Sequence, residues 1–297
     1  MKVGLILPMA SNDAGRIRSF ARDAEALGFD GLFAFDHFFP PGAPPDKPSF
    51  ESYSTLAALA AMTERVTLGT LVTRASLRPV GVLAKQVVAL DDISDGRFVL
   101  AIGTGDALSK AEHDAFGMPY LGPEIRREHL LETVRALRAL FAGEPWPGGA
   151  HVAAVAGPLL PPPVTPGGPP IWIGGTADAG VRAAGREADG WNGWGIAPDA
   201  FAAKVAVLDE ARGGRIVEPT WGGAIVVGRD REEAERIERE RRARGLNDDA
   251  FAGDPDDVVG WLRRFGDAGA TWCIALLGGG RDRLELFAEL VLPRVRA

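Results

Sequence analysis

Short apolar runs alternate with longer amphipathic stretches along most of the chain. Each run is bounded by glycine, proline or acidic residues, which is typical of strands that are covered on both faces. The longer stretches space their apolar residues three and four positions apart, as Ile17, Phe20, Ala24 and Leu27 are spaced. The predicted strands are residues 3–7, 31–35, 66–72, 98–102, 171–173, 189–194, 221–227 and 271–277.

Helices are predicted between and after these strands, and their order indicates the fold. Strands that alternate with helices pair in parallel through crossover helices. Eight such repeats favour an α/β fold closed into a (β/α)8 TIM barrel over an open sheet, so we predict one barrel domain over residues 1–297. The predicted helices are residues 13–27, 54–62, 79–93, 124–141, 177–187, 198–211, 232–244, 254–268 and 284–295, with a helical turn near 110–116.

Two segments interrupt the alternation. Residues 143–170, after the fourth long helix, contain many prolines and glycines and only a weak strand signal at residues 151–155. We predict that this insertion leaves the barrel as an excursion that resembles a hairpin. The proline-rich segment 40–48 has neither a helical nor a strand pattern, and we predict a loop there that helps to shape a substrate pocket.

Composition removes several classes of function. A net charge of -7 argues against a nucleic-acid binder or a basic membrane-surface protein. No apolar run approaches the ~20 residues of a membrane helix, and the N-terminus lacks a signal-peptide pattern, so we expect a cytoplasmic protein. Cys273 is the only cysteine, which excludes a disulfide framework within the chain. It lies in a predicted strand, where a core cysteine is a better interpretation than a catalytic thiol.

The carboxyl ends of the strands are where a barrel of this kind places its site. These ends hold one histidine, two carboxylates, several glycines and two tryptophans. We find neither the histidine spacing of a helical zinc site nor a Gly-x-Ser-x-Gly elbow, so we predict no metal, and we disfavour a hydrolytic triad. This inventory indicates a site that uses an organic cofactor. The ends are residues 36–37, 70–74, 103–106, 174–176, 191–194 and 278–281.

Each candidate residue has a functional and a structural interpretation. His37 follows a strand directly and can pass a proton near neutral pH, or it can be satisfied by a loop carbonyl. Asp106 either acts directly or caps the segment that follows it. Residues 174–176 (Gly-Gly-Thr) open a helix and form either a phosphate seat or a tight turn. Trp194 is either a stacking surface or a core residue. The Gly-Thr-Gly of residues 103–105 is either a close approach to a ligand or an ordinary turn.

Taken in order, several stretches of the chain resemble the bacterial luciferase-like flavin and deazaflavin oxidoreductases, and within them the branch that uses coenzyme F420. Each stretch is weak alone, but their order and spacing cover nearly the whole chain. The stretches are Ala24-Glu-Ala-Leu-Gly-Phe-Asp-Gly31 leading into Asp36-His37, Glu64-Arg-Val-Thr-Leu-Gly-Thr-Leu-Val72, Lys85-Gln86 through Leu90-Asp91, Ser94-Asp-Gly-Arg97, Gly103-Thr-Gly-Asp106, Ile171-Trp-Ile-Gly-Gly175, Ala188-Asp-Gly-Trp191 and Val291-Leu-Pro-Arg294.

The resemblance implies a (β/α)8 barrel with a planar tricyclic cofactor in its mouth. It implies a non-prolyl cis peptide bond behind the ring, which falls on Leu71–Val72, and a strand-end histidine that falls on His37. The acid that follows Gly-x-Gly is often Glu in dehydrogenase members and is Asp106 here, so the same proton-transfer role is open to question. The catalytic residues implied are His37 and Asp106, and the cofactor-binding residues are Asp36, Thr70, Leu71, Val72, Gly103, Thr104, Gly105, Asp106, Gly174, Gly175, Thr176 and Trp194.

By resemblance, the expected activity is hydride transfer between C5 of F420 and a carbon of a small organic substrate. One alternative is an FMN-dependent monooxygenase, which would need a flavin reductase as its partner. An alternative of another class is a non-catalytic barrel with a filled mouth. The resemblance also implies a homodimer, and neither nucleic acid nor membrane is an expected partner.

Overall fold

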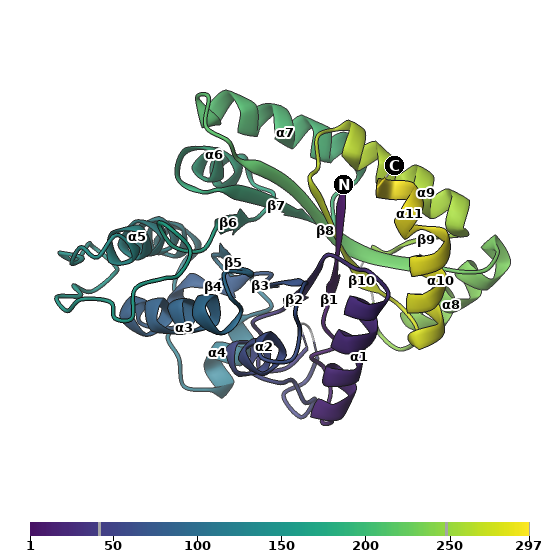
Figure 1. Cartoon of the computed structure of the whole chain (residues 1–297), viewed down its shortest axis with the longest axis horizontal. Helices are drawn as coiled ribbons and strands as arrows, with labels where there is room; N and C mark the ends of the chain where they lie inside the picture. Colours follow the sequence, from purple (N-terminus) through teal and green to yellow (C-terminus); the bar gives the residue numbers. More distant parts are fainter. Residues whose placement is uncertain (41–42, 247–248, 297) are drawn as a thin grey trace.

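The computed structural model describes residues 1–40, 43–246 and 249–296 of the chain. Its strands form a closed parallel barrel, because β10, which begins the strand order beside β1, also pairs with β8 near the other end. This confirms the predicted TIM barrel, and Figure 1 shows the helices arranged outside the strands. The strands are β1 (Lys2–Ile6), β2 (Gly31–Ala34), β3 (Thr67–Thr70), β4 (Thr73–Arg74), β5 (Phe98–Gly103), β6 (Ile171–Gly174), β7 (Gly190–Trp194), β8 (Glu218–Val227), β9 (Phe251–Gly253) and β10 (Trp272–Leu277).

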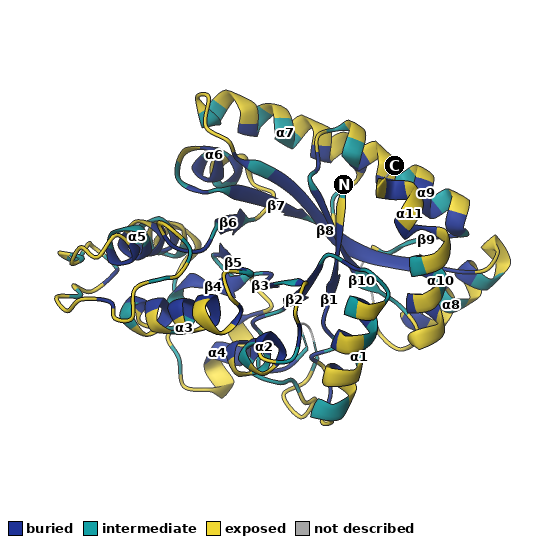
Figure 2. Cartoon of the chain, in the orientation of Figure 1, coloured by how far each residue is buried: buried dark blue, intermediate teal, exposed yellow. Residues whose placement is uncertain are grey.

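The helices cover the barrel with one apolar face each. Figure 2 shows the strands as largely buried and the outer helix faces as exposed, the arrangement that the periodicity predicts. The helices are α1 (Ala14–Ala26), α2 (Ser52–Ala60), the 3₁₀ helix η1 (Ala75–Leu77), α3 (Val80–Ile93), α4 (Lys110–Ala115), α5 (Pro123–Phe141), α6 (Asp178–Glu187), α7 (Pro198–Arg212), α8 (Arg231–Ala243), α9 (Pro255–Asp267), α10 (Arg281–Leu290) and α11 (Leu292–Arg296). Among the described residues, no helix is long and apolar enough to cross a membrane.

The boundaries of several elements differ from the predictions. The predicted strand 66–72 is divided, because the chain bulges at Leu71–Val72 between β3 and β4. β8 begins at Glu218 rather than residue 221, since its polar first residues pair with β7. The three-residue strand β9 was not predicted; it pairs only with the far end of the long strand β8. The predicted closing helix 284–295 begins earlier and is divided into α10 and α11.

Three large aromatic side chains fill the barrel interior below the strand ends. Phe33 lies against Trp172 and Trp272, with ring centroids 5.9 and 5.7 Å away. The neighbouring strand β3 leaves the Phe33 ring little room, because a Cβ added at Gly69, the register partner of Phe33, would lie 2.7 Å from this ring. Such a plug makes the interior a packed core rather than a pore, and it leaves only the mouth for a ligand.

The excursion packs against α5 and α3, where the Thr165 hydroxyl donates to Asp91 of α3 at 2.6 Å. Its one antiparallel bridge joins Trp146 to Val155, so the predicted hairpin is present in a minimal form. The Glu132 carboxylate of α5 accepts three consecutive backbone N–H groups of the excursion, from residues 150–152, at 2.8 to 2.9 Å. In the predicted loop 40–48, no helix or strand is present among the described residues, and residues 41–42 lie outside them.

Candidate active site at the barrel mouth

The carboxyl ends of the strands meet at one end of the barrel, because all of its strands are parallel. Two contacts join strand ends that are far apart in the sequence. The Asp36 carboxylate after β2 accepts the backbone N–H of Arg74 at 3.3 Å, and the Trp194 ring of β7 lies 5.2 Å from the Phe35 ring. The predicted strand-end residues therefore gather around one mouth.

The bulge at Leu71–Val72 organises this mouth. Its peptide bond is cis and non-prolyl, as the resemblance predicts. A Cβ on Gly103 would lie 2.7 Å from one Val72 methyl group, and a Cβ on Gly174 would lie 2.6 Å from the other. A close approach was one interpretation of Gly103, and the group that approaches both Gly103 and Gly174 within the chain is Val72. Any larger residue at either position would push Val72 out of its place.

An apolar rim surrounds the bulge. Phe35, Val72, Trp194 and Leu276 are half-buried, and they pack on the buried cluster inside the barrel. Trp194 meets Phe35 edge to face, with an interplanar angle of 79°. Trp194 therefore combines the two interpretations: it packs on the buried cluster, and part of its side chain stays accessible. A half-buried apolar rim of this kind suits a flat aromatic ligand.

The helix that follows β6 begins without a side-chain cap. Residues 175–179 are exposed, and no side chain caps the N-terminus of α6 among the described residues. The N–H of Gly175 donates to the Asn192 carbonyl at 3.0 Å, so this amide is already in use. Gly175 has a φ of +137°, and a Cβ there would meet no atom within 4 Å. The space beside Gly175 and the free amides of the first turn can accommodate a phosphate group.

The predicted histidine is held by a residue that the sequence did not single out. Glu112, a fully buried residue of α4, accepts a hydrogen bond from Nδ1 of His37 at 2.5 Å. The backbone N–H of Phe38 donates to its other oxygen at 2.7 Å. The His37 side chain keeps an exposed fraction of 17%, and within the described residues its Nε2 has no partner. His37 thus has one ring nitrogen fixed by the protein and one available to a ligand.

Arg74 of β4 completes this cluster, and we missed it as well. Its Nη2 donates to the same Glu112 oxygen at 2.9 Å, and its guanidinium lies 5.4 Å from the Phe38 ring centre. Burial alone would raise the pKa of Glu112, but the hydrogen bonds and charges of His37, Phe38 and Arg74 lower it overall. Glu112 is therefore a carboxylate that can only accept hydrogen bonds. Nε and Nη1 of Arg74 are buried with no acceptor among the described residues.

Asp36 supports the mouth from within the protein. Its buried carboxylate accepts both terminal nitrogens of Arg78, at 2.6 and 2.8 Å, and the Ser52 hydroxyl at 2.9 Å. Burial alone would raise the pKa of this carboxyl, but the Arg78 and Arg74 charges and the hydrogen bonds hold it below its ordinary value. We predicted a cofactor contact for Asp36. The structure encloses the carboxylate in protein donors, where it ties Arg74 and Arg78, which follow the bulge, to Ser52 of α2. A contact between Asp36 and a cofactor stays a prediction.

Two further predicted contacts are also engaged within the chain. The Thr70 hydroxyl is buried and donates to the Ala101 carbonyl at 2.8 Å, which ties β3 to β5. The Thr104 hydroxyl donates to the Gly105 carbonyl at 3.0 Å. Thr70 therefore stabilises the barrel wall, because the single proton of its hydroxyl is donated to a backbone carbonyl.

Asp106 lies on the exposed loop after β5. Its carboxylate accepts the backbone N–H of Ser109 at 3.0 Å and the Ser109 hydroxyl at 3.1 Å. Arg126 of α5 holds the same loop through the Gly105 carbonyl at 2.8 Å. This is the local cap that one interpretation of Asp106 anticipated. A direct catalytic role for Asp106 stays a prediction.

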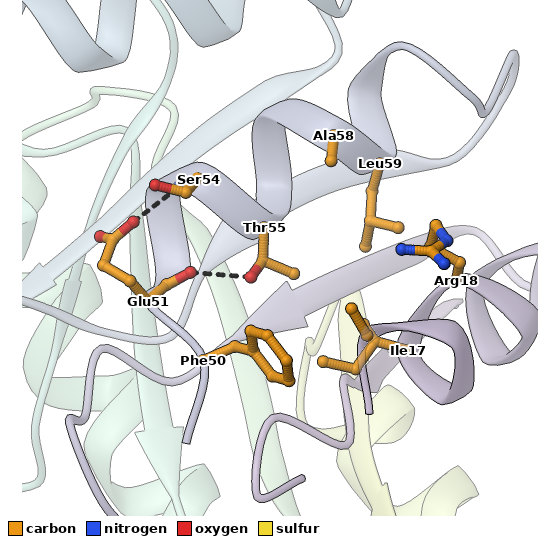
Figure 3. A pocket seen from close by; sticks show the side chains of 9 residues that line it. Ile17, Arg18, Phe50, Glu51, Ser54, Thr55, Ala58 and Leu59 are labelled. Carbon is orange, nitrogen blue, oxygen red and sulfur yellow. Dashed lines mark hydrogen bonds between the residues drawn. The ribbon is translucent and has the colours of Figure 1, made fainter. Parts of the chain in front are cut away.

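A separate hollow of about 260 Å³ lies outside the barrel between α1 and α2. Figure 3 shows Ile17 and Phe50 facing each other in this hollow, with the polar residues Glu51, Ser54 and Thr55 on the side of α2. Glu51 links this hollow to the mouth, because it also accepts a hydrogen bond from Nη2 of Arg78 at 3.1 Å. The hollow holds no catalytic group of the cluster around His37, so we place the candidate site at the barrel mouth.

The side chains at the mouth offer proton handling and an apolar platform. Among the described residues, no group of three or more His, Cys, Asp or Glu is arranged to hold a metal ion. Cys273 is buried in β10, and burial raises the pKa of its thiol, so it resists ionisation. The fold and the mouth together define an α/β barrel of the TIM class, in which the site lies at the carboxyl ends of the strands.

The sequence supports a more specific assignment. A model of the family described as luciferase-like monooxygenase matches residues 1–244. The chain belongs to this family, as its sequence motifs predicted.

Solved structures with the same fold include enzymes that use two different cofactors. An F420-dependent secondary alcohol dehydrogenase, in complex with an F420-acetone adduct, is 18% identical and superposes with a TM-score of 0.85 over 100% of this chain and 99% of its own. F420-dependent tetrahydromethanopterin reductase from Methanopyrus kandleri is 20% identical, with a TM-score of 0.80 over 99% and 100% of the two chains. The oxygenating constituent of 3,6-diketocamphane monooxygenase from Pseudomonas putida, in complex with FMN, is 19% identical, with a TM-score of 0.76 over 99% of each.

Proposed function

We propose that this protein is an F420-dependent oxidoreductase that transfers a hydride between the deazaflavin and a small organic substrate. The observation that carries the proposal is the mouth itself: the apolar Leu71–Val72 bulge lies in the same cluster of strand ends as a histidine that the protein holds by one nitrogen only. An oxidoreductase of this family needs a flat surface for the ring and a group that exchanges a proton with the substrate.

The residues at the mouth fit such a cofactor in two places. Val72, lodged over Gly103 and Gly174, presents an apolar surface to the mouth, and Trp194 and Phe35 lie on its rim. The uncapped N-terminus of α6, with open space beside Gly175, suits the phosphate that F420 and FMN both carry. When bound, the deazaflavin accepts or donates a hydride at C5 and reacts poorly with oxygen.

The proton-transfer steps are carried out by residues of the protein. With Nδ1 donating to Glu112, neutral His37 presents a lone pair at Nε2. When a substrate is oxidised, His37 accepts the substrate's proton at Nε2 while the electron pair leaves as hydride, and in the reverse direction the imidazolium returns the proton. The positive charge then formed on the ring is stabilised by the Glu112 carboxylate.

An FMN-dependent monooxygenase is the second candidate, because one solved structure of the same fold is a monooxygenase in complex with FMN. It would use the same mouth, with a flavin reductase as its partner. The stretches at residues 103–106 and 189–192 favour F420 by resemblance. A non-catalytic barrel is the candidate of another class. The open Nε2 of His37 and the uncapped helix α6 speak against it.

Titration with each cofactor distinguishes the three candidates. F420 is expected to quench the tryptophan fluorescence of the protein and to bind with micromolar affinity, because Trp194 lies on the rim of the proposed ring site. FMN should bind at least about ten-fold more weakly, a difference of roughly 1.4 kcal/mol. Isothermal titration calorimetry with both cofactors checks this. Binding of FMN without binding of F420 would favour the monooxygenase, and binding of neither would favour the non-catalytic barrel.

A further inference from the structure

Glu112 accepts three hydrogen bonds, and their arrangement determines what each carboxylate oxygen does. Oε1 faces Nδ1 of His37 at 2.5 Å. Oε2 faces the backbone N–H of Phe38 at 2.7 Å and Nη2 of Arg74 at 2.9 Å. All of these contacts are buried or half-buried, so water cannot easily replace a lost partner.

We propose that Glu112 is the positioning residue that holds His37 in the Nδ1–H tautomer and thereby makes Nε2 the proton acceptor of the site. This inference rests on the proton-transfer role of His37 given under Proposed function, but the tautomer itself is a property of the protein without cofactor or substrate. A carboxylate has no proton to give, so the proton in the 2.5 Å contact belongs to His37. A histidine held in this way has its second nitrogen free as an acceptor.

Arg74 and Phe38 fix which oxygen of Glu112 faces the histidine. Both are obligatory donors: a guanidinium carries N–H groups only, and a backbone N–H has no acceptor capacity. They both donate to Oε2, which leaves Oε1 for His37. The three contacts thus orient the carboxylate as well as the ring, and α4 brings the acid to a histidine that lies 75 residues earlier in the chain.

The same geometry predicts an unusual result for Glu112→Gln. A glutamine has one acceptor oxygen and one NH₂ group, and its oxygen must face the two donors, Phe38 and Arg74. Its NH₂ then points at Nδ1 of His37, which has to accept. The ring proton moves to Nε2, so the nitrogen that faces the mouth becomes a donor. In a serine protease, an Asp-to-Asn change that inverts a catalytic histidine in this way lowers kcat about 10⁴-fold.

Nitrogen NMR of the histidine side chains tests the proposal directly. The chain has only 4 histidines, so selective ¹⁵N-histidine labelling gives a simple spectrum, and a His37→Gln sample assigns the His37 signals. In the wild-type protein without cofactor, we expect neutral His37 with its proton on Nδ1. In Glu112→Gln we expect the proton on Nε2, with kcat for proton-coupled turnover reduced on the order of 10²–10⁴-fold.

Asp114 supplies the matched control on the same helix. It is exposed and pairs with Lys110, so Asp114→Asn should leave the His37 tautomer unchanged. The proposal is overturned if wild-type His37 carries its proton on Nε2, if it stays an imidazolium throughout the stable pH range, or if Glu112→Gln keeps the wild-type tautomer. The wild-type spectrum alone decides the first two outcomes, even if Glu112→Gln does not fold. Failure of F420 to bind would overturn the proposed function and leave this result unaffected.

Discussion

Replacing His37 by alanine is expected to lower kcat about 10²–10⁴-fold, the usual contribution of a general acid or base. The cofactor Kd should change only a few-fold, because the proposed ring and phosphate contacts are made by other residues. His37 has one nitrogen held by Glu112 and one open, and half-buried Phe35 lies next to it at 6.3 Å between ring centroids. No other histidine of the described residues is held in this way at the mouth.

The measurement is steady-state kinetics with a substrate that the wild-type protein turns over, with cofactor binding measured in parallel. His151→Ala is the matched control. His151 pairs with Glu128 of α5, beside the excursion, and its replacement should leave kcat within about two-fold. Equal kcat values for wild-type protein and His37→Ala would remove His37 from the mechanism. A loss of cofactor binding in His37→Ala would indicate that His37 binds the cofactor instead of transferring a proton.

Replacing Arg78 by alanine is expected to lower the free energy of unfolding by about 3–5 kcal/mol, the usual cost of removing one partner of a buried ion pair. Asp36 is almost fully buried, and Arg78 holds both of its oxygens. Without Arg78, the carboxylate keeps only Ser52 and the Arg74 N–H as partners. The Arg78 guanidinium also lies 4.7 Å from the Tyr53 ring centre, and this contact would be lost too.

Urea unfolding at pH 7 measures the change. Arg135→Ala is the control, because Arg135 is more than half exposed in its pair with Glu187 and should contribute no more than about 1 kcal/mol. A loss below about 1 kcal/mol for Arg78→Ala would show that the Asp36 pair does not hold the mouth together.

The difference in unfolding free energy between wild-type protein and Arg78→Ala should also depend on pH, and the lowered pKa of Asp36 gives the sign of this dependence. The pKa of Asp36 is lowered in the folded protein, so its stabilisation is fully present above the unfolded value of ~3.9. That stabilisation is lost as the pH falls through the folded value. The difference between wild-type protein and Arg78→Ala should therefore narrow in acid, and a difference that widens there would contradict the assignment.

The barrel could be predicted from sequence because its signal is local. Each strand is a short apolar run, each helix has its own period, and closure follows from their number and alternation. The position of His37 at a strand end followed from the same pattern. The bulge did not: the pattern predicted an unbroken strand over residues 66–72, and only the family resemblance placed a bulge at Leu71–Val72. The small errors fall at the two ends of the long strand β8. Its start pairs the polar residues Glu218 and Thr220 with β7, and β9, which pairs with its other end, has only three residues and so no readable period.

The polar partners of the site could not be predicted in this way. Glu112 lies on a short helix in a polar loop, and no spacing rule connects it to a histidine 75 residues away. Likewise, no spacing rule connects Arg78 to Asp36, which lies 42 residues earlier in the chain. A carboxylate in a sequence can be solvated or buried, and only the fold decides which of these holds. Asp106 shows the converse: its local pattern allowed a cap as readily as a catalytic role, and the structure gives it the contacts of a cap.

The central claim is that the cofactor ring lies at the barrel mouth on the Leu71–Val72 bulge. A crystal structure of the protein with bound F420 tests it most directly. The ring should contact Val72 and lie within reach of His37, with the phosphate at the start of α6 near Gly175. F420 seated in the hollow between α1 and α2, or at the mouth with its phosphate far from α6, would contradict the account.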